Sequence, residues 1–574
     1  MDSCLGRRGP AVIMDRFTTM RRILPWLGAS IFLLLFFFYP LMRILGLGFD
    51  WSGLKVGWDQ VARLAGSTLW FTFYQAFLST LLTLMVGLPG AYLIAHYDFK
   101  GKKLFNALTA VPFMLPTVVV AAGFNALLGP RGWVNVALMN LFHLDNAPIL
   151  FMNTLAAILL AHVFYNTTIV FRLVGNAWMR LDLHLSQAAR MMGAKPRDVF
   201  WKVSMPLLRP SILAAALLVF LFDFTSFGVI LLLGGPHFAT LEVEIFIQSV
   251  QMLNLPVAAL LSIIQLLFTL AFSVLYSRVV SKVNVASKPA LNPMRKVNTW
   301  RSRILVSGIL IFLVSLFILP MAALPLRSIT RFDPAMGERT VQTTSLTLDY
   351  YRELFINRNG SLFYVAPIEA VRNSLSYAGL TVLISLVLGF PVASALARPG
   401  RLERILDPFL MLPLGASAVT LGLGYIVSFN QSPFNFLTSP WLVPLAHSTI
   451  ALPFVIRSLQ PALAAIPDDY RKAAAVLGAP PLRAWFAVNW PLIGRATLAA
   501  GTFAFTVSLG EFGATSILAR PENPTLPLAI YRFLSQPGGL NYGQAMAMAS
   551  LLMLVATLAI LLIERMRLPG SGNF

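Results

Sequence analysis

The chain is a succession of long apolar segments separated by short polar ones. Apolar runs recur along its whole length, and about 20 apolar residues in a helix suffice to cross a bilayer. The pattern predicts an all-α polytopic membrane protein. It places twelve transmembrane helices near residues 23–46, 68–96, 106–128, 154–177, 209–233, 256–280, 304–326, 373–397, 406–427, 441–460, 495–518 and 541–564.

Composition supports this interpretation. The 574 residues are 57% hydrophobic and 12% charged, with a mean hydropathy of +0.74, whereas soluble domains carry about 25% charged residues. The first apolar segment is too long for a typical signal-peptide core, so we expect it to be an uncleaved span. The single cysteine, Cys4, excludes an internal disulfide, and Met14 is an alternative start that would remove it.

The net charge of +21 is distributed unevenly. Of the 44 lysines and arginines, 32 lie in residues 1–22, 98–107, 172–210, 278–303, 398–404, 457–495 and 565–567. These segments share one side of the predicted membrane, so the positive-inside rule places them and both termini in the cytoplasm. Basic residues in short interspan loops indicate a bilayer as the partner and no nucleic acid. We therefore expect a multi-pass protein of the bacterial plasma (inner) membrane.

One polar segment occurs twice. Residues 187–206 read QAARMMGAKPRDVFWKVSMP and residues 472–491 read KAAAVLGAPPLRAWFAVNWP, at a constant offset of 285. The same offset aligns further residues: His162 with His447, Phe227 with Phe512, Gly228 with Gly513, Thr240 with Thr525 and Leu241 with Leu526. The repeat therefore extends well beyond the loop, as expected after duplication and fusion of a gene.

The repeat divides the chain into two halves of six spans in the same orientation, a parallel repeat. The predicted parts are a cytoplasmic tail 1–22, a first half 23–280, a basic linker 281–303, a second half 304–564 and a cytoplasmic tail 565–574. No catalytic residues and no metal ligands are evident. The chain has no GxxxxGK[ST] phosphate loop, HExxH or CxxC motif.

The duplicated segment has the pattern of a helical elbow. Its alanines give a small-residue face, and Gly193 and Gly478 suit the left-handed conformation that ends a helix. Pro196, and Pro480 or Pro481, suit the first turn of a second helix. Asp468 or Asp469 is expected to cap the second copy.

The spacing of Ala-Ala, Gly and Pro resembles the EAA loop of permeases from type I binding-protein-dependent ATP-binding-cassette importers. The matching residues are Gln187, Ala188, Ala189, Gly193 and Pro206 in the first half, and Lys472, Ala473, Ala474, Gly478 and Pro491 in the second. The leading glutamate of that family is absent from both copies, which puts any ion pair it makes in doubt.

This resemblance implies a function. The chain would form the translocation path, two copies of a cytoplasmic ATPase would bind the two loops, and an extracytoplasmic solute-binding protein would deliver cargo. ATP would be used by the partners, and this chain would hold no cofactor and would not be an enzyme. Fusion of two halves resembles the thiamine and ferric-iron permeases. The segment Leu233-Gly234-Gly235-Pro236 with Thr240-Leu241-Glu242 looks most like the thiamine type.

Ionisable and polar residues within spans are candidates for the translocation path, because burying them in lipid is costly. They are Asp223, its neighbour Ser226, Glu511, and the matched pair His162 and His447. A purely structural role, in which the histidines brace helix packing, is at least as well supported. Paired prolines predict kinks in the third and ninth spans.

The principal alternative is a secondary transporter driven by an ion gradient, since twelve spans in two parallel halves also suit that class. That class would need intramembrane carboxylates for coupling ions, and it has no use for two matched elbows. A membrane-embedded enzyme or scaffold has no supporting motif.

Overall fold

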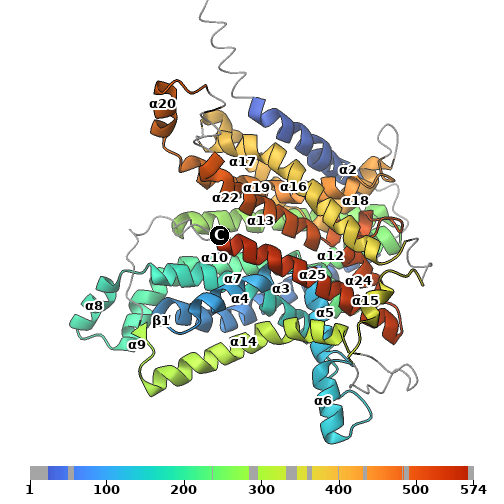
Figure 1. Cartoon of the computed structure of the whole chain (residues 1–574), viewed down its shortest axis with the longest axis horizontal. Coiled ribbons are helices and arrows are strands. Elements are labelled where there is room, and N and C mark those ends of the chain that lie inside the picture. The colour runs from blue at the N-terminus through green and yellow to red at the C-terminus, as the bar shows by residue number, and fades with distance from the viewer. Residues whose placement is uncertain are drawn as a thin grey trace, which may run out of the picture.

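A computed structural model describes most of the chain. The described residues are 24–49, 57–235, 237–283, 295–330, 346–358, 365–397, 400–430, 436–480, 483 and 490–566. Almost all of the regular structure is helical (Figure 1).

The first half contains η1 (Leu34–Phe38, a π-helical turn), α2 (Tyr39–Phe49), α3 (Trp58–His96), α4 (Lys102–Met114), α5 (Thr117–Leu128), α6 (Trp133–Phe142), α7 (Leu155–Met179), α8 (Leu183–Met191), α9 (Pro196–Val199), η3 (Phe200–Ser204), α10 (Met205–Phe224), α11 (Gly228–Leu233), α12 (Leu241–Phe246), η4 (Ile247–Gln251) and α13 (Leu255–Val283). The second half contains α14 (Trp300–Ser328), α15 (Asp349–Glu353), α16 (Ile368–Leu396), α17 (Arg401–Met411), the 3₁₀ turn η6 (Leu412–Gly415), α18 (Ala418–Phe429), α19 (Leu442–Ala464), α20 (Asp468–Val476), α22 (Trp490–Gly510), α23 (Gly513–Leu518), α24 (Leu526–Leu534) and α25 (Gly539–Met566).

The described residues contain nine helices long and apolar enough to span a membrane, and up to eleven if two bent helix pairs each count as one span. The bends lie between Leu104–Met114 and Thr117–Phe142 (108°) and between Arg401–Gly415 and Ala418–Phe429 (97°). They fall at the predicted third and ninth spans, where prolines interrupt the helices. The remaining predicted span, the eleventh, begins with α22. The all-α polytopic fold is thus confirmed, with two spans bent sharply.

The fifth and eleventh spans differ from the sequence prediction. Residues 209–233 and 495–518 were each expected to form one helix, but α10 ends at Phe224 and α22 ends at Gly510, each followed by a six-residue helix, α11 or α23. Both breaks occupy equivalent positions in the repeat. The few polar residues at each break are flanked by apolar runs on both sides, which is why hydropathy averaged over a window does not reveal it.

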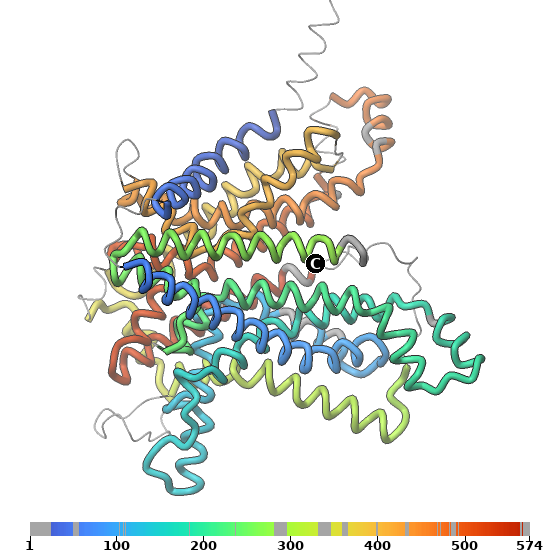
Figure 2. Tube along the Cα trace, turned by 180° about the vertical axis from the view of Figure 1, so that it is seen from behind, coloured from blue at the N-terminus to red at the C-terminus, as the bar shows by residue number. Residues whose placement is uncertain are grey.

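The first helix of each half packs on the other half. Within the first span, Leu24–Phe49, α2 contacts α18 of the other half as well as α13 of its own, and α14 contacts α5 of the other half as well as α25 of its own. In Figure 1 the blue α2 lies among the yellow and orange helices, whereas the yellow-green α14 lies along the blue and cyan ones, and Figure 2 shows the same exchange from behind. The halves are therefore interlocked rather than merely adjacent. A two-residue parallel pairing of β1 (Tyr97–Asp98) with β2 (Arg295–Lys296) attaches the end of the linker to the first half.

Candidate functional site

The first duplicated loop forms the expected elbow. Helix α8 ends in a left-handed residue, Gly193 (φ +87°). The N–H of Gly193 donates to the carbonyl of Arg190 (2.9 Å), and the N–H of Ala194 donates to the carbonyl of Ala189 (3.0 Å). This is a Schellman ending. Pro196 then opens α9, and the chain enters α10, whose second residue is Pro206.

The second loop ends its helix in the same way. Gly478 has φ +76°, its N–H donates to the carbonyl of Ala475 (3.0 Å), and the N–H of Ala479 donates to the carbonyl of Ala474 (3.0 Å). Pro491 is the second residue of α22. Of the two predicted helix starts, Pro480 is not in a helix, and Pro481 lies outside the described residues. Two helices far apart in sequence therefore end in the same backbone geometry.

The expected capping of the second loop is wrong. Pro467, and neither Asp468 nor Asp469, occupies the N-cap of α20, and a proline side chain cannot accept a capping hydrogen bond. The carboxylate of Asp469 instead forms an ion pair with Lys472 (3.2 Å). In the first copy Asp182 caps α8 by accepting from the N–H of His184 (2.8 Å). Capping therefore differs between copies although the turn is shared.

Each elbow exposes a matched pair of large apolar side chains immediately before its glycine. Met191 and Met192 are 90% and 83% exposed, and their repeat partners Val476 and Leu477 are 87% and 86% exposed. Ala188 and Ala473 are also exposed, as are Gln187 and Lys472. Helices α8 and α20 project from the same end of the molecule, on opposite sides of it (Figure 1). The arrangement offers two separate apolar contact points, which sequence reasoning did not single out.

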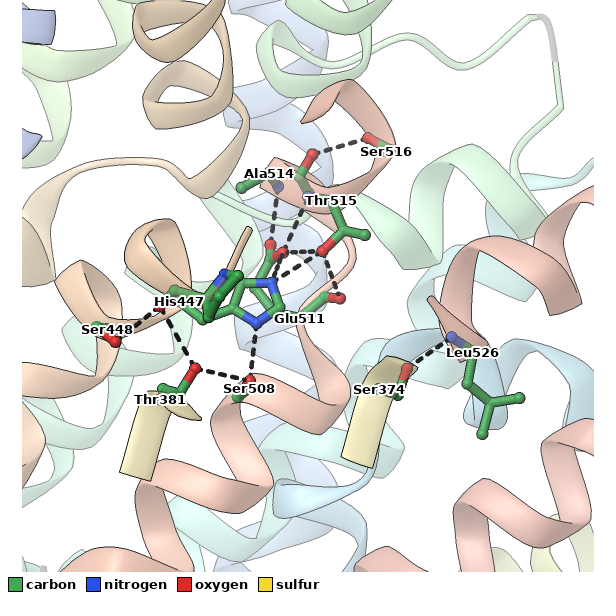
Figure 3. Close-up of polar contacts among 12 residues, drawn as sticks. Ser374, Thr381, His447, Ser448, Ser508, Glu511, Ala514, Thr515, Ser516 and Leu526 are labelled. Atoms are coloured by element: carbon green, nitrogen blue, oxygen red, sulfur yellow. Dashed lines mark hydrogen bonds and ion pairs between the residues drawn. The ribbon is translucent and has the colours of Figure 1, made fainter. Parts of the chain in front are cut away.

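The predicted path residues of the second half form one buried cluster around the break after α22 (Figure 3). Glu511 accepts from the N–H groups of Ala514 (2.8 Å) and Thr515 (3.0 Å), so it satisfies the free amides at the start of α23. His447, from α19, places Nε2 3.2 Å from the Glu511 carboxylate and Nδ1 2.7 Å from Ser508 Oγ.

The first half repeats this arrangement with different residues. His162, from α7, places Nε2 2.8 Å from Ser226 Oγ and Nδ1 3.4 Å from Asp223 Oδ1. Asn166 donates to the same carboxylate oxygen of Asp223 (2.7 Å), and Gln75 donates to the Asp223 carbonyl (2.8 Å).

We call each histidine with the two residues that it bridges a histidine clasp. Ser508 is the repeat counterpart of Asp223, and Glu511 is that of Ser226. Each histidine thus contacts the same two positions: one in the last turns of the helix before the break, and one within the break. The acid occupies the first of these positions in the first half and the second of them in the second half. The structure therefore brings the predicted residues together as two separate clusters, one in each half.

A line of four aromatic rings crosses between the two halves. Phe246 lies 5.4 Å from Phe227, Phe227 lies 5.5 Å from Phe512, and Phe512 lies 5.5 Å from Tyr531, measured between ring centroids. The outer rings correspond by the repeat, as do the inner ones. Phe227 and Phe512 are 7% and 3% exposed. This aromatic stack lies on the pseudo-symmetric interface, directly beside both helix breaks.

A further buried acid lies in this region. Glu242, at the start of α12, is 1% exposed, and its carboxylate accepts hydrogen bonds from Gln265 and from Ser417 of the other half (2.5 Å each). In the sequence, Glu242 is notable only as part of a segment that resembles thiamine permeases. The sequence gives no sign that the residue is buried, because Glu242 lies in a loop between predicted spans.

Comparison with known proteins agrees with this architecture. The family model described as "Binding-protein-dependent transport system inner membrane component" matches residues 87–285 and again residues 385–567. The probable ABC transporter permease protein y4fN of Sinorhizobium fredii is 26% identical over 98% of this chain and 100% of its own length.

Two thiamine transport system permease proteins are similarly related. The ThiP protein of Brucella abortus is 28% identical, covering 88% of this chain and 89% of its own. The ThiP protein of Escherichia coli is 26% identical, covering 90% and 92%. The resemblance inferred from the loops is confirmed, in the fused two-half form. The chain belongs to the family of inner-membrane permease components of binding-protein-dependent transport systems.

Proposed function

We propose that this permease imports thiamine or its phosphates, and that two ATPase subunits drive it through the α8 and α20 elbows. The observation that carries the coupling is the matched pair of exposed apolar residues at each elbow, Met191-Met192 and Val476-Leu477. Large apolar side chains left in water mark contact sites for other proteins. We call each of these exposed apolar pairs a knob. Two matching knobs at one end of the molecule suit two copies of one partner.

The elbows are built to transmit movement. Each is joined to a span that leads to a helix break: η3 continues into α10, and α22 follows the second loop. A displacement of either elbow would move the fifth or the eleventh span and, through it, Phe227 or Phe512. ATP binding by the partners would draw the elbows together, and hydrolysis would release them. The energy comes from the partners, while this chain supplies the path and the levers.

The remaining assignments complete the proposal. A solute-binding protein would dock at the end opposite the elbows and deliver cargo. The elbows, both termini and the linker would face the cytoplasm of a bacterium, as the basic loops indicate. The relatives named thiamine transport system permease proteins support thiamine as cargo. The secondary-transporter alternative is not favoured, because the family is one of binding-protein-dependent systems.

Uptake tests the cargo. The chain, its ATPase and its binding protein would be produced together in a bacterium whose own thiamine importer is deleted, and uptake of radiolabelled thiamine and of ferric iron measured. We expect thiamine uptake that requires all three components. Uptake of ferric iron without uptake of thiamine would show that ferric iron, and not thiamine, is the cargo. Thiamine uptake that persists without the ATPase, and stops when the ion gradient is collapsed, would refute the coupling and favour a secondary transporter.

A further inference from the structure

Glu242 is a buried acid for which the coupling mechanism has no use. It is 1% exposed, and its hydrogen-bond partners Gln265 and Ser417 are both neutral. Among the described residues no lysine, arginine or histidine forms an ion pair with it. A buried carboxylate without a cationic partner is costly to ionise, so a positive charge that enters beside Glu242 would be stabilised by it.

A second buried group beside Glu242 also lacks a partner. The side-chain carbonyl oxygen of Gln265 has no hydrogen-bond donor among the described residues, and Gln265 is 1% exposed. The same amide group touches the Glu242 carboxylate through its nitrogen. A buried acceptor therefore adjoins a buried carboxylate, and both are suited to a cationic or hydrogen-bond-donating guest.

The aromatic stack is linked to buried acids along the chain. Glu242 is one helical turn before Phe246 on α12, and Glu511 directly precedes Phe512. Each half thus has one buried carboxylate within one helical turn, in sequence, of a ring of the stack. Gly228 permits the close approach of the halves here, because a Cβ at that position would lie 2.3 Å from Thr117 Oγ1 and 3.2 Å from Phe512.

We propose that Glu242 and the aromatic stack form a selective constriction in the path that takes a flat organic cation. Aromatic faces attract cations, more strongly when both are removed from water. A buried carboxylate that has no cation of its own among the described residues can balance the charge of a cationic ligand. The combination favours a delocalised organic cation, whose ring can lie against Phe227 or Phe512 while its charge is balanced by Glu242.

The inference deepens the proposed function, on which it rests, because thiamine carries a positively charged thiazolium ring. The role assigned to Glu242 is nevertheless a property of the path and can be measured without any cargo. Its counterpart in the repeat is Pro527, so the constriction is asymmetric. Only the first half supplies an acid at this position.

Cysteine chemistry provides the test. The chain has one cysteine, so a Cys4→Ser, Phe227→Cys variant carries a single reporter thiol at the stack. The protein would be reconstituted in vesicles with its ATPase. The rate of thiol modification would then be measured with two thiosulfonate reagents, one that carries a cationic trimethylammonium group and one that carries an anionic sulfonate group. One unit charge nearby in a partly dry path is sufficient for at least about a tenfold preference for the cation.

The matched control is Glu244→Gln, two residues along α12, where the carboxylate accepts from Gln248 (2.8 Å). In the reporter background we expect Glu242→Gln to remove most of the cation preference and Glu244→Gln to leave it unchanged. Equal rates for both reagents, a preference insensitive to Glu242→Gln, or a thiol that reacts with neither reagent with or without ATP would each overturn the proposal. Because no cargo is involved, failure to import thiamine would be a separate result.

Discussion

The two halves of the molecule keep one device unchanged and vary another. The elbows share their left-handed glycines, their Schellman hydrogen bonds and their exposed apolar pairs. The histidine clasps share the histidine and the two positions that it contacts, but the acid is Asp223 in one half and Glu511 in the other. The difference is the one expected if, as proposed, a symmetric partner binds both elbows, whereas each clasp contains a single acid.

The largest effect should follow from breaking what the halves share. Gly193→Val with Gly478→Val puts a branched side chain at two positive-φ positions, and a left-handed L-residue costs roughly 1–2 kcal/mol. We expect retention of the ATPase on the purified permease to fall at least about tenfold. Gly308→Val is the matched control, because a Cβ there meets nothing within 4 Å and its φ is ordinary. An equal loss in the control would contradict a specific role for the elbows.

The clasps should differ in strength. Glu511 accepts from two backbone N–H groups and the Thr515 hydroxyl and also contacts His447, whereas the Asp223 carboxylate accepts from Asn166 and lies beside His162. Hydrogen bonds to buried charged groups contribute about 1.5–3 kcal/mol each. Glu511→Gln should therefore lower the thermal unfolding temperature in detergent more than Asp223→Asn. The reverse order would refute this ranking.

The exchange of acid positions can be tested by making one half resemble the other. Asp223→Ser alone removes the first clasp's acid, and adding Ser226→Glu restores one at the position used by Glu511. Because His162 already contacts Ser226 (2.8 Å), we expect the double variant to recover at least half of the unfolding temperature lost in Asp223→Ser. A double variant less stable than the single one would show that the clasps are not equivalent.

The smallest effect should come from the missing family glutamate. Lys472 is exposed and pairs with exposed Asp469, and such surface pairs contribute about 0–1 kcal/mol. Lys472→Glu is expected to leave the unfolding temperature unchanged and to alter ATPase retention by no more than about twofold. A strong gain in retention would indicate that the glutamate makes a contact which this chain has lost.

Sequence patterns predicted the order of the spans, the division into halves and the elbows, because long apolar runs and repeated spacings reflect local requirements. They also identified His162, His447, Asp223, Ser226 and Glu511 as the unusual polar residues of the interior. They missed the helix breaks after Phe224 and Gly510, since hydropathy does not distinguish a bent apolar segment from a straight one.

Two further features could not be predicted for a different reason: the burial of Glu242, and the packing of the first span of each half on the other half. Both depend on contacts between residues far apart in sequence, such as Glu242 with Ser417 or α2 with α18. The aromatic stack is a partial exception. Its four members match in pairs at the repeat offset, so the repeat contained a signal that only the structure makes interpretable.

The mass of the purified complex with its ATPase tests the central claim most directly. The account predicts two ATPase copies on the wild-type chain, one on Met191→Asp, one on Val476→Asp and none on the double variant, because each variant charges one exposed apolar knob. Met252→Asp, at a methionine that is 65% exposed outside the elbows, should retain both. A wild-type chain that holds fewer than two copies, or a double variant that still holds two, would contradict the account.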